Sequence, residues 1–335
     1  MKSFKSYIIA EIGQAHDGSL GFAHSYIDAL SKTGVDAIKF QTHIAEAESS
    51  KYEKFRTNFS YEDKCRYDYW KRMEFSLEQW KGLKNHCTDK GVDFISSPFS
   101  CKAVDILEQV GVKKYKIGSG EINNYLMLEK IAKTKKPIIL SSGMSDTNEL
   151  KNSLKFLSNY NSDISLLHCT TSYPTKETDW TFNMINELKN EFKIPIGFSD
   201  HSGIPSTCLA ARCFGAEILE FHAIFHKSSF GPDNSSSLTI EEIKLMVNSI
   251  RKIERSFKTK KIDKSTRFND IKVLFGKSLA INKNLKKGHK LKFEDLESKK
   301  PYGKGIDCRF YSDVIGKYIK RNMKKWDFLN KSDID

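Results

Sequence analysis

The sequence has little of what export, membrane insertion or disulfide stapling would require. Its 335 residues include seven cysteines, an odd number, and no two of them are spaced as CxxC. A chain of this length buries enough apolar surface without cross-links, so these cysteines indicate a reducing compartment. No run approaches the roughly 18 apolar residues of a membrane-spanning helix, and the first residues have too short an apolar run for a signal peptide. We therefore expect a cytoplasmic protein with no membrane partner.

Acidic residues are outnumbered by basic ones. Lys and Arg total 55 against 42 Asp and Glu, which gives a formal net charge of +13. The basic residues in excess lie in segments that also contain acidic residues, and their density increases mainly after residue 250. We therefore interpret them as a solvated lysine surface that steers anionic substrates. We expect no nucleic-acid partner. The alternative, a nucleic-acid binder built on the basic tail, predicts binding that weakens steeply with salt.

Phosphate-binding loops of the common nucleotide folds are also missing. No predicted strand is followed by GxGxxG and no GxxxxGK[ST] occurs, which argues against a doubly wound dinucleotide-binding sheet. Short runs rich in Ile, Val and Phe instead alternate with longer amphipathic segments, as in βα units. Eight strands are predicted, at residues 7–11, 36–40, 92–97, 114–117, 137–141, 164–168, 194–199 and 217–222. Eight such units in roughly 250 residues predict an α/β fold of the (β/α)8 TIM-barrel type.

Two segments break this rhythm. Residues 43–75 are too long for an ordinary βα loop and rich in aromatic residues, so they form either a lid over the barrel mouth or a plain surface insertion. Residues 258–275 are polar and lysine-rich and read as a linker. We therefore predict a barrel at 1–257, a linker at 258–275 and a small C-terminal domain at 276–335.

Polar residues that close the predicted strands are the candidate site, because the C-terminal ends of barrel strands face the active site. Lys39 and Lys116 interrupt apolar strands, where each ammonium needs a carboxylate or anion partner. Together with nearby hydroxyls and glycines they favour binding of a multiply charged anion such as a phosphate or phosphocarboxylate. His201 and His222 predict a divalent metal. The other strand-end candidates are Glu11, Gln41, Ser96, Ser97, Ser119, Glu121, Ser141, Ser142, His168, Thr170, Thr171, Ser199 and Asp200.

Several of these candidates also have purely structural interpretations. Glu11 could pair with Lys39 on the neighbouring strand, and the GSGE turn at 118–121 could be only a strand-to-helix connection. Tyr173 lies in a loop stiffened by proline, and Asp233 follows a Gly-Pro turn signal. Asp233 would take part only if its loop folds over the barrel mouth. The prediction of an anion and metal site therefore rests on all of these residues together and not on any one of them.

A set of motifs in fixed order adds a family resemblance. They are IIAEIGQAHDGSL, DAIKFQTH, SSPFS, KIGSGEINNYLMLEKIA, KPIILSSGM, LLHCTTSYPT, IGFSDHSG, EILEFHAIF, FGPDNSSSL and the C-terminal SLAINKNLKKGHKLKFEDLESKKP. Through them nearly the whole chain resembles the bacterial sialic acid synthases, which make N-acetylneuraminate, legionaminate or pseudaminate from phosphoenolpyruvate and a hexosamine aldehyde. The resemblance implies a TIM barrel followed by an antifreeze-like (SAF, β-clip type) domain. It also implies a domain-swapped homodimer in which each small domain covers the partner's barrel.

The resemblance also implies roles for individual residues. Phosphoenolpyruvate would be held by Lys39, Ser97, Lys116, Ser119, Ser141 and Ser199, with Thr171 and Tyr173 completing its pocket. His201 and His222 would ligate Mn²⁺, with Mg²⁺ or Co²⁺ as alternatives, and Glu11, Gln41, Glu121 and Asp233 would face the sugar and the reacting water. The implied catalytic set is Glu11, Lys39, Lys116, Glu121, His201 and His222.

Three positions depart from the family pattern. Ala15 stands before His16 where the family commonly has Asn, and Thr171 stands where some members have Asn. Lys300 occupies the place of an Arg of the small domain that reaches the partner's site, and lysine cannot make the same bidentate contact with the sugar's N-acyl group.

N-Acetylmannosamine is the expected second substrate. The alternative is a di-N-acetylated 6-deoxyhexose, which gives legionaminate or pseudaminate. A noncatalytic carbohydrate-binding homologue is a further alternative, against which the joint retention of Lys39, Lys116, His201 and His222 argues.

Overall fold

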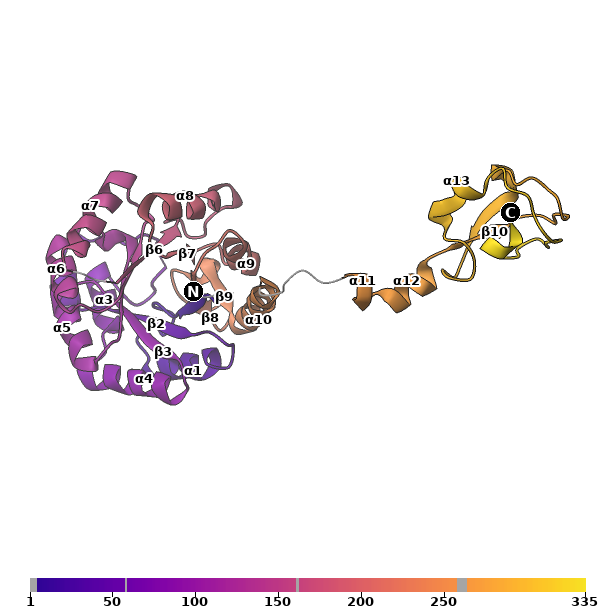
Figure 1. Cartoon of the computed structure of the whole chain (residues 1–335). Coiled ribbons are helices and arrows are strands. Elements are labelled where there is room, and N and C mark those ends of the chain that lie inside the picture. Colours follow the sequence, from indigo (N-terminus) through magenta and orange to yellow (C-terminus); the bar gives the residue numbers. More distant parts are fainter. Residues whose placement is uncertain (1–4, 58, 161–162, 258–263) are drawn as a thin grey trace. The chain divides into compact units, whose positions relative to one another are not determined.

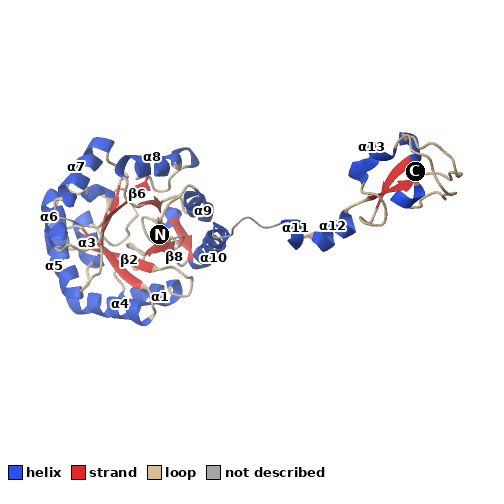
Figure 2. Cartoon of the chain, in the orientation of Figure 1, coloured by secondary structure: helices blue, strands red, loops and turns tan. Residues whose placement is uncertain are grey.

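The computed structural model describes residues 5–57, 59–160, 163–257 and 264–335. The chain divides into two compact units, Met1–Lys258 and Thr259–Asp335 (Figure 1). In the described part of the first unit, β1 pairs in parallel with both β2 and β8, which closes the first eight strands into a barrel. Helices surround this ring of strands (Figure 2). The predicted (β/α)8 barrel is confirmed.

The barrel strands fall where the apolar runs predicted them, with ends shifted by no more than two residues. They are β1 Tyr7–Glu11, β2 Ala37–Thr42, β3 Asp93–Pro98, β4 Tyr115–Ile117, β5 Ile138–Ser141, β6 Ile164–Cys169, β7 Ile196–Asp200 and β8 Ile218–Ile224. A short additional strand, β9 Ser237–Thr239, was not predicted. It pairs with β8 in parallel and places Ser237 opposite His222, so the loop between these strands folds back over the barrel.

The helices of this unit begin and end at recognisable local signals. Helix α4 starts at a capping box of Ser76 and Gln79, α7 starts at one of Asp146 and Glu149, and α5 ends at Gly111 with a left-handed φ of 80°. The helices are α1 Leu20–Leu30, α2 Ala45–Glu48, α3 Arg66–Met73, α4 Leu77–Asp89, α5 Cys101–Val110, α6 Tyr125–Lys133, α7 Thr147–Ser158, α8 Asn183–Phe192, α9 Pro205–Cys213 and α10 Ile240–Phe257. Short 3-10 turns lie at Ser119–Glu121, Glu177–Asp179 and Asn234–Ser236. In the described residues, no helix has the length and apolar character needed to cross a membrane.

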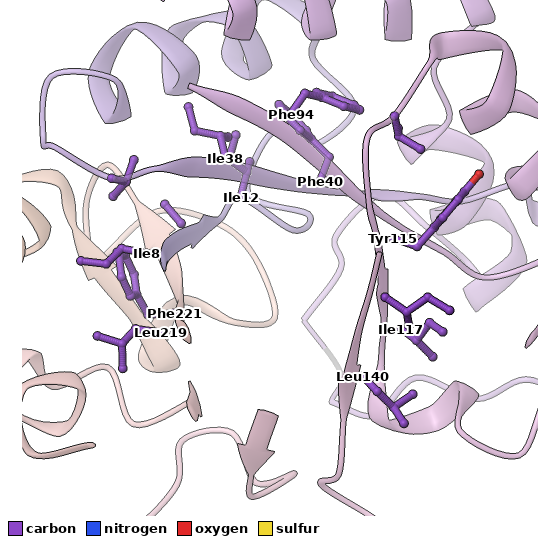
Figure 3. Close-up of a cluster of buried hydrophobic side chains, with 14 of the residues drawn as sticks. Ile8, Ile12, Ile38, Phe40, Phe94, Tyr115, Ile117, Leu140, Leu219 and Phe221 are labelled. Atoms are coloured by element: carbon purple, nitrogen blue, oxygen red, sulfur yellow. The ribbon is translucent and has the colours of Figure 1, made fainter. Parts of the chain in front are cut away.

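Strand alternation sorts the side chains between two environments. One set points outward and packs under the helices in the main core; Figure 3 labels several of its members, including Ile8, Phe40, Phe94, Tyr115 and Phe221. The other set points into the barrel and forms a separate buried cluster of Ile9, Ala37, Ile95, Ile139 and Leu167. Because successive residues of a strand alternate, the positions two residues further along lie directly above this apolar layer. Those positions hold Glu11, Lys39, Ser97, Ser141 and Cys169.

The segment 43–75 folds onto the barrel mouth through α2 and α3. Its buried core contains Ala45, Tyr69, Trp70 and Met73, with Phe55, Phe59 and Tyr67 packed against it. Arg72 ties it to the loop after β1, because its guanidinium donates to Asp17 Oδ1 at 2.5 Å while also pairing with Asp63 at 2.8 Å. The segment is therefore a fixed wall of the mouth, which favours the functional interpretation over a plain surface insertion.

The second unit has its own apolar core, which contains residues such as Leu279, Ile281, Leu291, Ile319 and Leu329. Its elements are α11 Lys264–Arg267, α12 Asn269–Phe275, β10 Ser278–Ile281, β11 Leu296–Lys299 and α13 Tyr311–Val314, with 3-10 turns at Phe293–Asp295, Cys308–Phe310 and Lys331–Asp333. Strands β10 and β11 are antiparallel. That this unit is an antifreeze-like domain stays a prediction.

The predicted linker at residues 258–275 contains two short helices. Its residues 258–263 lie outside the described part of the chain, but residues 264–275 form α11 and α12. Composition alone missed α12, because its apolar residues Ile271, Leu274 and Phe275 are interspersed among the polar ones and remain exposed in the single chain.

Candidate active site

A cavity of about 370 Å³ opens at the C-terminal ends of the barrel strands. Every residue of the barrel unit to which the family resemblance gives a role lines it, whereas the strand-end candidates Ser96, Ser142, His168, Thr170 and Asp200 are not among its lining residues. The lining residues with such a role are Glu11, Lys39, Gln41, Ser97, Lys116, Ser119, Glu121, Ser141, Thr171, Tyr173, Ser199, His201, His222 and Asp233. Because they come from all eight strands or the loops after them, closure of the barrel is what brings them together.

The floor of the cavity is a buried group of two lysines and two glutamates. Glu11 forms an ion pair with Lys39, as one interpretation of the sequence anticipated. Glu220 Oε1 lies 3.7 Å from Lys39 Nζ and 3.4 Å from Lys116 Nζ, so one carboxylate serves both cations. All four residues are less than 5% exposed. Each buried ammonium group thus has a carboxylate partner in the free protein. This is the kind of partner that a lysine within an apolar strand requires.

Glu220 was missed by the sequence reasoning, although a signal was present. It lies two residues before His222 in β8, and residues two apart in a strand share a face, so His222 in the barrel interior implies Glu220 there too. Burial alone would raise the pKa of Glu220, but the ion pairs with Lys116 and Lys39 lower it to about 2. Glu220 is therefore an anion that lies beside both lysines, and it offsets part of the burial that lowers the pKa of Lys39 to about 7.

Hydroxyls and backbone amides cluster beside the lysines. Lys116 Nζ donates to Ser141 Oγ at 2.7 Å, and Lys39 Nζ donates to Ser97 Oγ at 3.4 Å. The amide of Gly143 donates to Ser119 Oγ at 3.0 Å. A side chain at Gly143 would lie 2.2 Å from Thr171 Oγ1 and 2.8 Å from Cys169 Sγ, so only glycine leaves this corner open. The corner offers several donors to an anionic group.

His201 and His222 face each other across the cavity, with 5.5 Å between their ring centroids. His201 Nδ1 lies 2.9 Å from the carbonyl oxygen of Thr170, to which it donates, so the lone pair lies on Nε2, which accepts from the Tyr173 hydroxyl at 3.2 Å. Burial and the neighbouring His222 lower the pKa of His201 to about 3, and burial also lowers the pKa of His222. Both rings are therefore neutral near pH 7.

Two neighbouring neutral imidazoles fit a divalent cation that keeps open positions, provided that the Tyr173 hydroxyl gives up its contact with His201 Nε2. Among the described residues, no group of three or more His, Cys, Asp or Glu side chains is arranged to hold a metal ion. Asp233 Oδ2 lies 3.9 Å from His222 Nδ1, which is an electrostatic contact and not a ligand geometry. Water and substrate would have to supply the remaining ligands.

A hydrogen-bonded chain fixes the polar groups above the floor. Gln41 Nε2 donates to Glu11 Oε1 at 3.1 Å, while Gln41 Oε1 faces His43 Nε2 at 3.0 Å and accepts from Gln14. His43 Nδ1 contacts Glu48 Oε1 at 2.6 Å. On the neighbouring wall, Glu121 accepts from Asn124 at 2.7 Å, and burial raises the pKa of Glu121. Glu11, Gln41 and Glu121 thus have defined orientations toward the cavity.

The outer wall comes from residues that the sequence analysis did not single out. The segment 43–75 supplies Glu48, Glu53, Arg56, Arg66, Tyr69 and Trp70, and Phe99 and Met144 complete this side. The sequence offered the length and aromatic content of the segment as a signal, but not which of its charged residues turn inward.

Lys300 is the one predicted site residue outside the barrel unit. It is exposed, and its ammonium lies 4.9 Å from the centroid of the Phe275 ring in the second unit. Its expected contact with a partner's sugar substrate stays a prediction. His168, another strand-end histidine, is hydrogen-bonded to Thr181 at 2.9 Å and is not among the lining residues.

The fold and the cavity define a class: a TIM barrel whose cavity at the strand ends places two buried lysines near a pair of histidines. Sequence comparison supplies the family. The NeuB family profile matches residues 26–262, and the chain belongs to this family of sialic acid synthases.

Relatives of known name support this membership. The N,N'-diacetyllegionaminic acid synthase of Campylobacter jejuni is 34% identical over 98% of this chain and 99% of its own length. The human N-acetylneuraminate-9-phosphate synthase is 30% identical over 98% and 92% of the two chains. The crystal structure of the N-acetylneuraminic acid (sialic acid) synthetase from Leptospira borgpetersenii, in complex with citrate, superposes with a TM-score of 0.70 at 30% identity and covers 80% of this chain and 90% of that one. This chain is accordingly a transferase that forms a carbon–carbon bond.

Proposed function

We propose that this protein is a nonulosonic acid synthase that joins phosphoenolpyruvate to the aldehyde form of an N-acetylated hexosamine. In the reaction, C3 of phosphoenolpyruvate bonds to the aldehyde carbon and water adds at C2. The bond between C2 and the oxygen of the phosphate group then breaks, which releases inorganic phosphate. The observation that carries this proposal is the pair of buried lysines, Lys39 and Lys116, at the floor of a hydroxyl-lined cavity. Two lysines beside several hydroxyls suit a compact trianion such as phosphoenolpyruvate better than they suit a neutral ligand alone.

The anionic substrate would bind over the floor. Lys39 and Lys116 would neutralise its carboxylate and phosphate, and the hydroxyls of Ser141 and Ser119, which accept from Lys116 and from the Gly143 amide, would donate to the phosphate oxygens. Glu11 and Glu220 hold the two ammonium groups in place before substrate arrives, so little reorganisation is needed on binding.

Proton transfer falls to the carboxylates on the walls. The raised pKa of Glu121, caused by burial, moves this carboxyl toward the range in which it can accept and return a proton near neutral pH. Glu11 is the alternative acceptor, since one oxygen faces Gln41 and the other pairs with Lys39.

His201 and His222 would hold a divalent cation, with Mn²⁺ the first candidate and Mg²⁺ or Co²⁺ alternatives. When bound, the cation would polarise the aldehyde oxygen. The carbonyl of Thr170 keeps His201 in the tautomer that this role requires, and Tyr173 packs beside both rings.

N-Acetylmannosamine is the first candidate for the sugar. A di-N-acetylated 6-deoxyhexose is the second, because the relative in C. jejuni is named for N,N'-diacetyllegionaminic acid. The outer wall contains Tyr69, Trp70, Phe99 and Met144, whose apolar surfaces suit acyl methyl groups or a deoxy carbon.

The test is phosphate release from phosphoenolpyruvate with Mn²⁺, run in parallel with N-acetylmannosamine and the two di-N-acetylated deoxyhexoses. A chelator-treated sample and a Lys116→Met variant serve as controls. Chelator-sensitive release with one sugar identifies both reaction and substrate. No release with any sugar, from folded protein loaded with metal, refutes the proposal and favours the noncatalytic carbohydrate-binding alternative.

We further propose that the working form is a homodimer in which the second unit covers the partner's barrel. The exposed apolar residues Ile271, Leu274 and Phe275 of α12 support this proposal, because such a surface is costly to leave in water. Sedimentation of the wild type and of a Leu274→Lys, Phe275→Lys double variant tests it. A wild type that sediments as a monomer at micromolar concentration contradicts it.

A further inference from the structure

The guanidinium of Arg56 forms part of the mouth of the cavity, although Arg56 belongs to the segment 43–75 and to no barrel strand. Its Nη2 donates to Asp233 Oδ1 at 2.5 Å and to the carbonyl of Pro232 at 3.3 Å. Its Cζ lies 4.1 Å from the centroid of the Tyr173 ring. The centroid of the Tyr173 ring in turn lies 4.3 Å from that of His201, with the two rings tilted by 32°, so Arg56 lies one aromatic ring away from the histidine pair.

We propose that Arg56 is a specificity-determining residue that donates to an uncharged oxygen of the sugar substrate, a hydroxyl or an acyl carbonyl, and so favours neutral over phosphorylated sugars. The inference rests on the proposed function, which supplies the sugar. It assigns Arg56 to the sugar end of the cavity, whereas Lys39 and Lys116 belong to the phosphoenolpyruvate end.

The first argument is the donor inventory of Arg56. A guanidinium has five N–H groups, and among the described residues its acceptors, Asp233 and Pro232, both engage Nη2. Nε and Nη1 therefore keep donors for a ligand that enters the cavity. The side chain of Arg56 is 41% exposed and lines the cavity, so an entering ligand can reach it.

The second argument is the rigidity of its position. Asp233 fixes the guanidinium from the loop after β8, Tyr173 supports its face, and the aromatic contacts of Phe59 and Tyr61 with Phe230 hold the same two segments together. A donor that is already oriented loses little entropy when it binds a ligand, so its hydrogen bond contributes more to affinity.

The third argument is the charge balance of the outer wall. Both guanidinium groups there already face a carboxylate: Arg56 faces Asp233, and Arg66 Nε lies 3.3 Å from Glu53. Glu48 and Glu121 line the same cavity and add further carboxyl groups. A phosphate dianion on the sugar would meet this excess of acidic groups, whereas a hydroxyl or a carbonyl oxygen would not.

The decisive variant is Arg56→Met, which keeps most of the side-chain volume and removes all five donors. We expect the KM for the sugar to rise by about 10- to 100-fold, the range for loss of a hydrogen bond to a charged donor, while the KM for phosphoenolpyruvate changes by less than about twofold. Arg56→Lys should restore part of the sugar affinity, because one ammonium replaces the fork of the guanidinium.

Arg72→Met is the matched control. Arg72 belongs to the same segment and anchors it through Asp17 and Asp63, but it does not line the cavity. Its loss should lower thermal stability and leave the sugar KM near that of the wild type. If Arg72→Met raises the sugar KM as much as Arg56→Met does, Arg56 acts by anchoring the segment and the proposal is wrong.

The charge argument has its own readout. The wild type should use N-acetylmannosamine with a kcat/KM at least about tenfold above that for N-acetylmannosamine 6-phosphate. A preference for the phosphorylated sugar would overturn the inference while leaving the synthase activity established.

Should the wild type release no phosphate with any sugar, the proposed function fails. Sugar binding then still tests the role of Arg56. It is measured by calorimetric titration of the wild type and of Arg56→Met with each neutral sugar, in the presence of phosphoenolpyruvate and Mn²⁺. Weaker binding by the variant supports the assignment, and equal binding, or none to either protein, refutes it.

Discussion

Replacing Glu220 by Gln would remove the one carboxylate that serves both buried lysines. At an effective dielectric constant of about 20, each of its contacts, at 3.4 and 3.7 Å, is worth about 5 kcal/mol before desolvation. Desolvation of the carboxylate offsets much of this sum, and removal of one partner from a buried ion pair typically costs about 3 to 5 kcal/mol. We expect a loss of that size, seen as a fall of about 6 to 15 °C in the melting temperature of the barrel.

Phosphoenolpyruvate should reverse part of this loss, because its negative charge would take the place of the missing carboxylate between Lys39 and Lys116. The assay is thermal unfolding of the wild type and of Glu220→Gln, each with and without saturating phosphoenolpyruvate. The variant should gain more stability from the ligand than the wild type gains, since ligand stabilisation grows with affinity.

Glu254 offers a matched control. It is also a buried glutamate between two cations, with Arg212 and Arg251 each at 3.0 Å, and it does not line the cavity. Glu254→Gln should destabilise the barrel similarly yet respond to phosphoenolpyruvate as the wild type does. If Glu220→Gln melts at the wild-type temperature, or if the ligand stabilises both variants equally, the assigned electrostatic role of Glu220 is refuted.

Three further predictions follow from the same structure. His222→Ala should weaken Mn²⁺ binding by at least about 100-fold in calorimetry, whereas His168→Ala, whose ring contacts Thr181 outside the cavity, should bind as the wild type does; equal affinities in the two variants would contradict the metal assignment. Deletion of all residues after Gly276 should leave a cooperatively melting barrel, because the two units have separate cores, but turnover should drop strongly; full turnover would exclude a covering role for the second unit. Burial lowers the pKa of His16 to about 3, so the unfolded chain binds a proton below pH 6.5 that the folded chain does not, and the free energy of unfolding falls as the pH falls. Between pH 7 and pH 5 the stability advantage of the wild type over His16→Asn should therefore shrink by about 2 kcal/mol in denaturant titrations; an unchanged difference would show that His16 titrates normally.

Much of the barrel and of its site was predictable because both rest on short-range regularities. Apolar runs of four to six residues are separated by amphipathic helices, and this alternation places eight strands to within two residues of where they lie. The end of each run then gives polar residues near the mouth, and most of these line the cavity together with the loop residues Tyr173 and Asp233. The family motifs strengthened this list, because they occur in one order along nearly the whole chain.

Other features depend on contacts between segments that are distant in sequence. Glu220 matters because β8 closes against β1 and brings its carboxylate to lysines about 100 and 180 residues earlier in the chain, a register that composition does not encode. Arg56 turns into the mouth because Asp233 and Tyr173 meet it there from two other loops. Helix α12 lies within the predicted linker, because its apolar residues are interspersed among polar ones and composition does not distinguish the two.

The sequence by itself determined the element order, the barrel class, the family and the residue types of the chemistry, since each follows from local periodicity or from motifs read along the chain. Only the tertiary structure decided which charges pair and which donors stay open to a ligand. The physical reason is that the pKa of a buried carboxyl, the tautomer of a histidine and the direction of a guanidinium are set by neighbours a few ångströms away in space. In a closed barrel those neighbours come from strands and loops far apart in the chain.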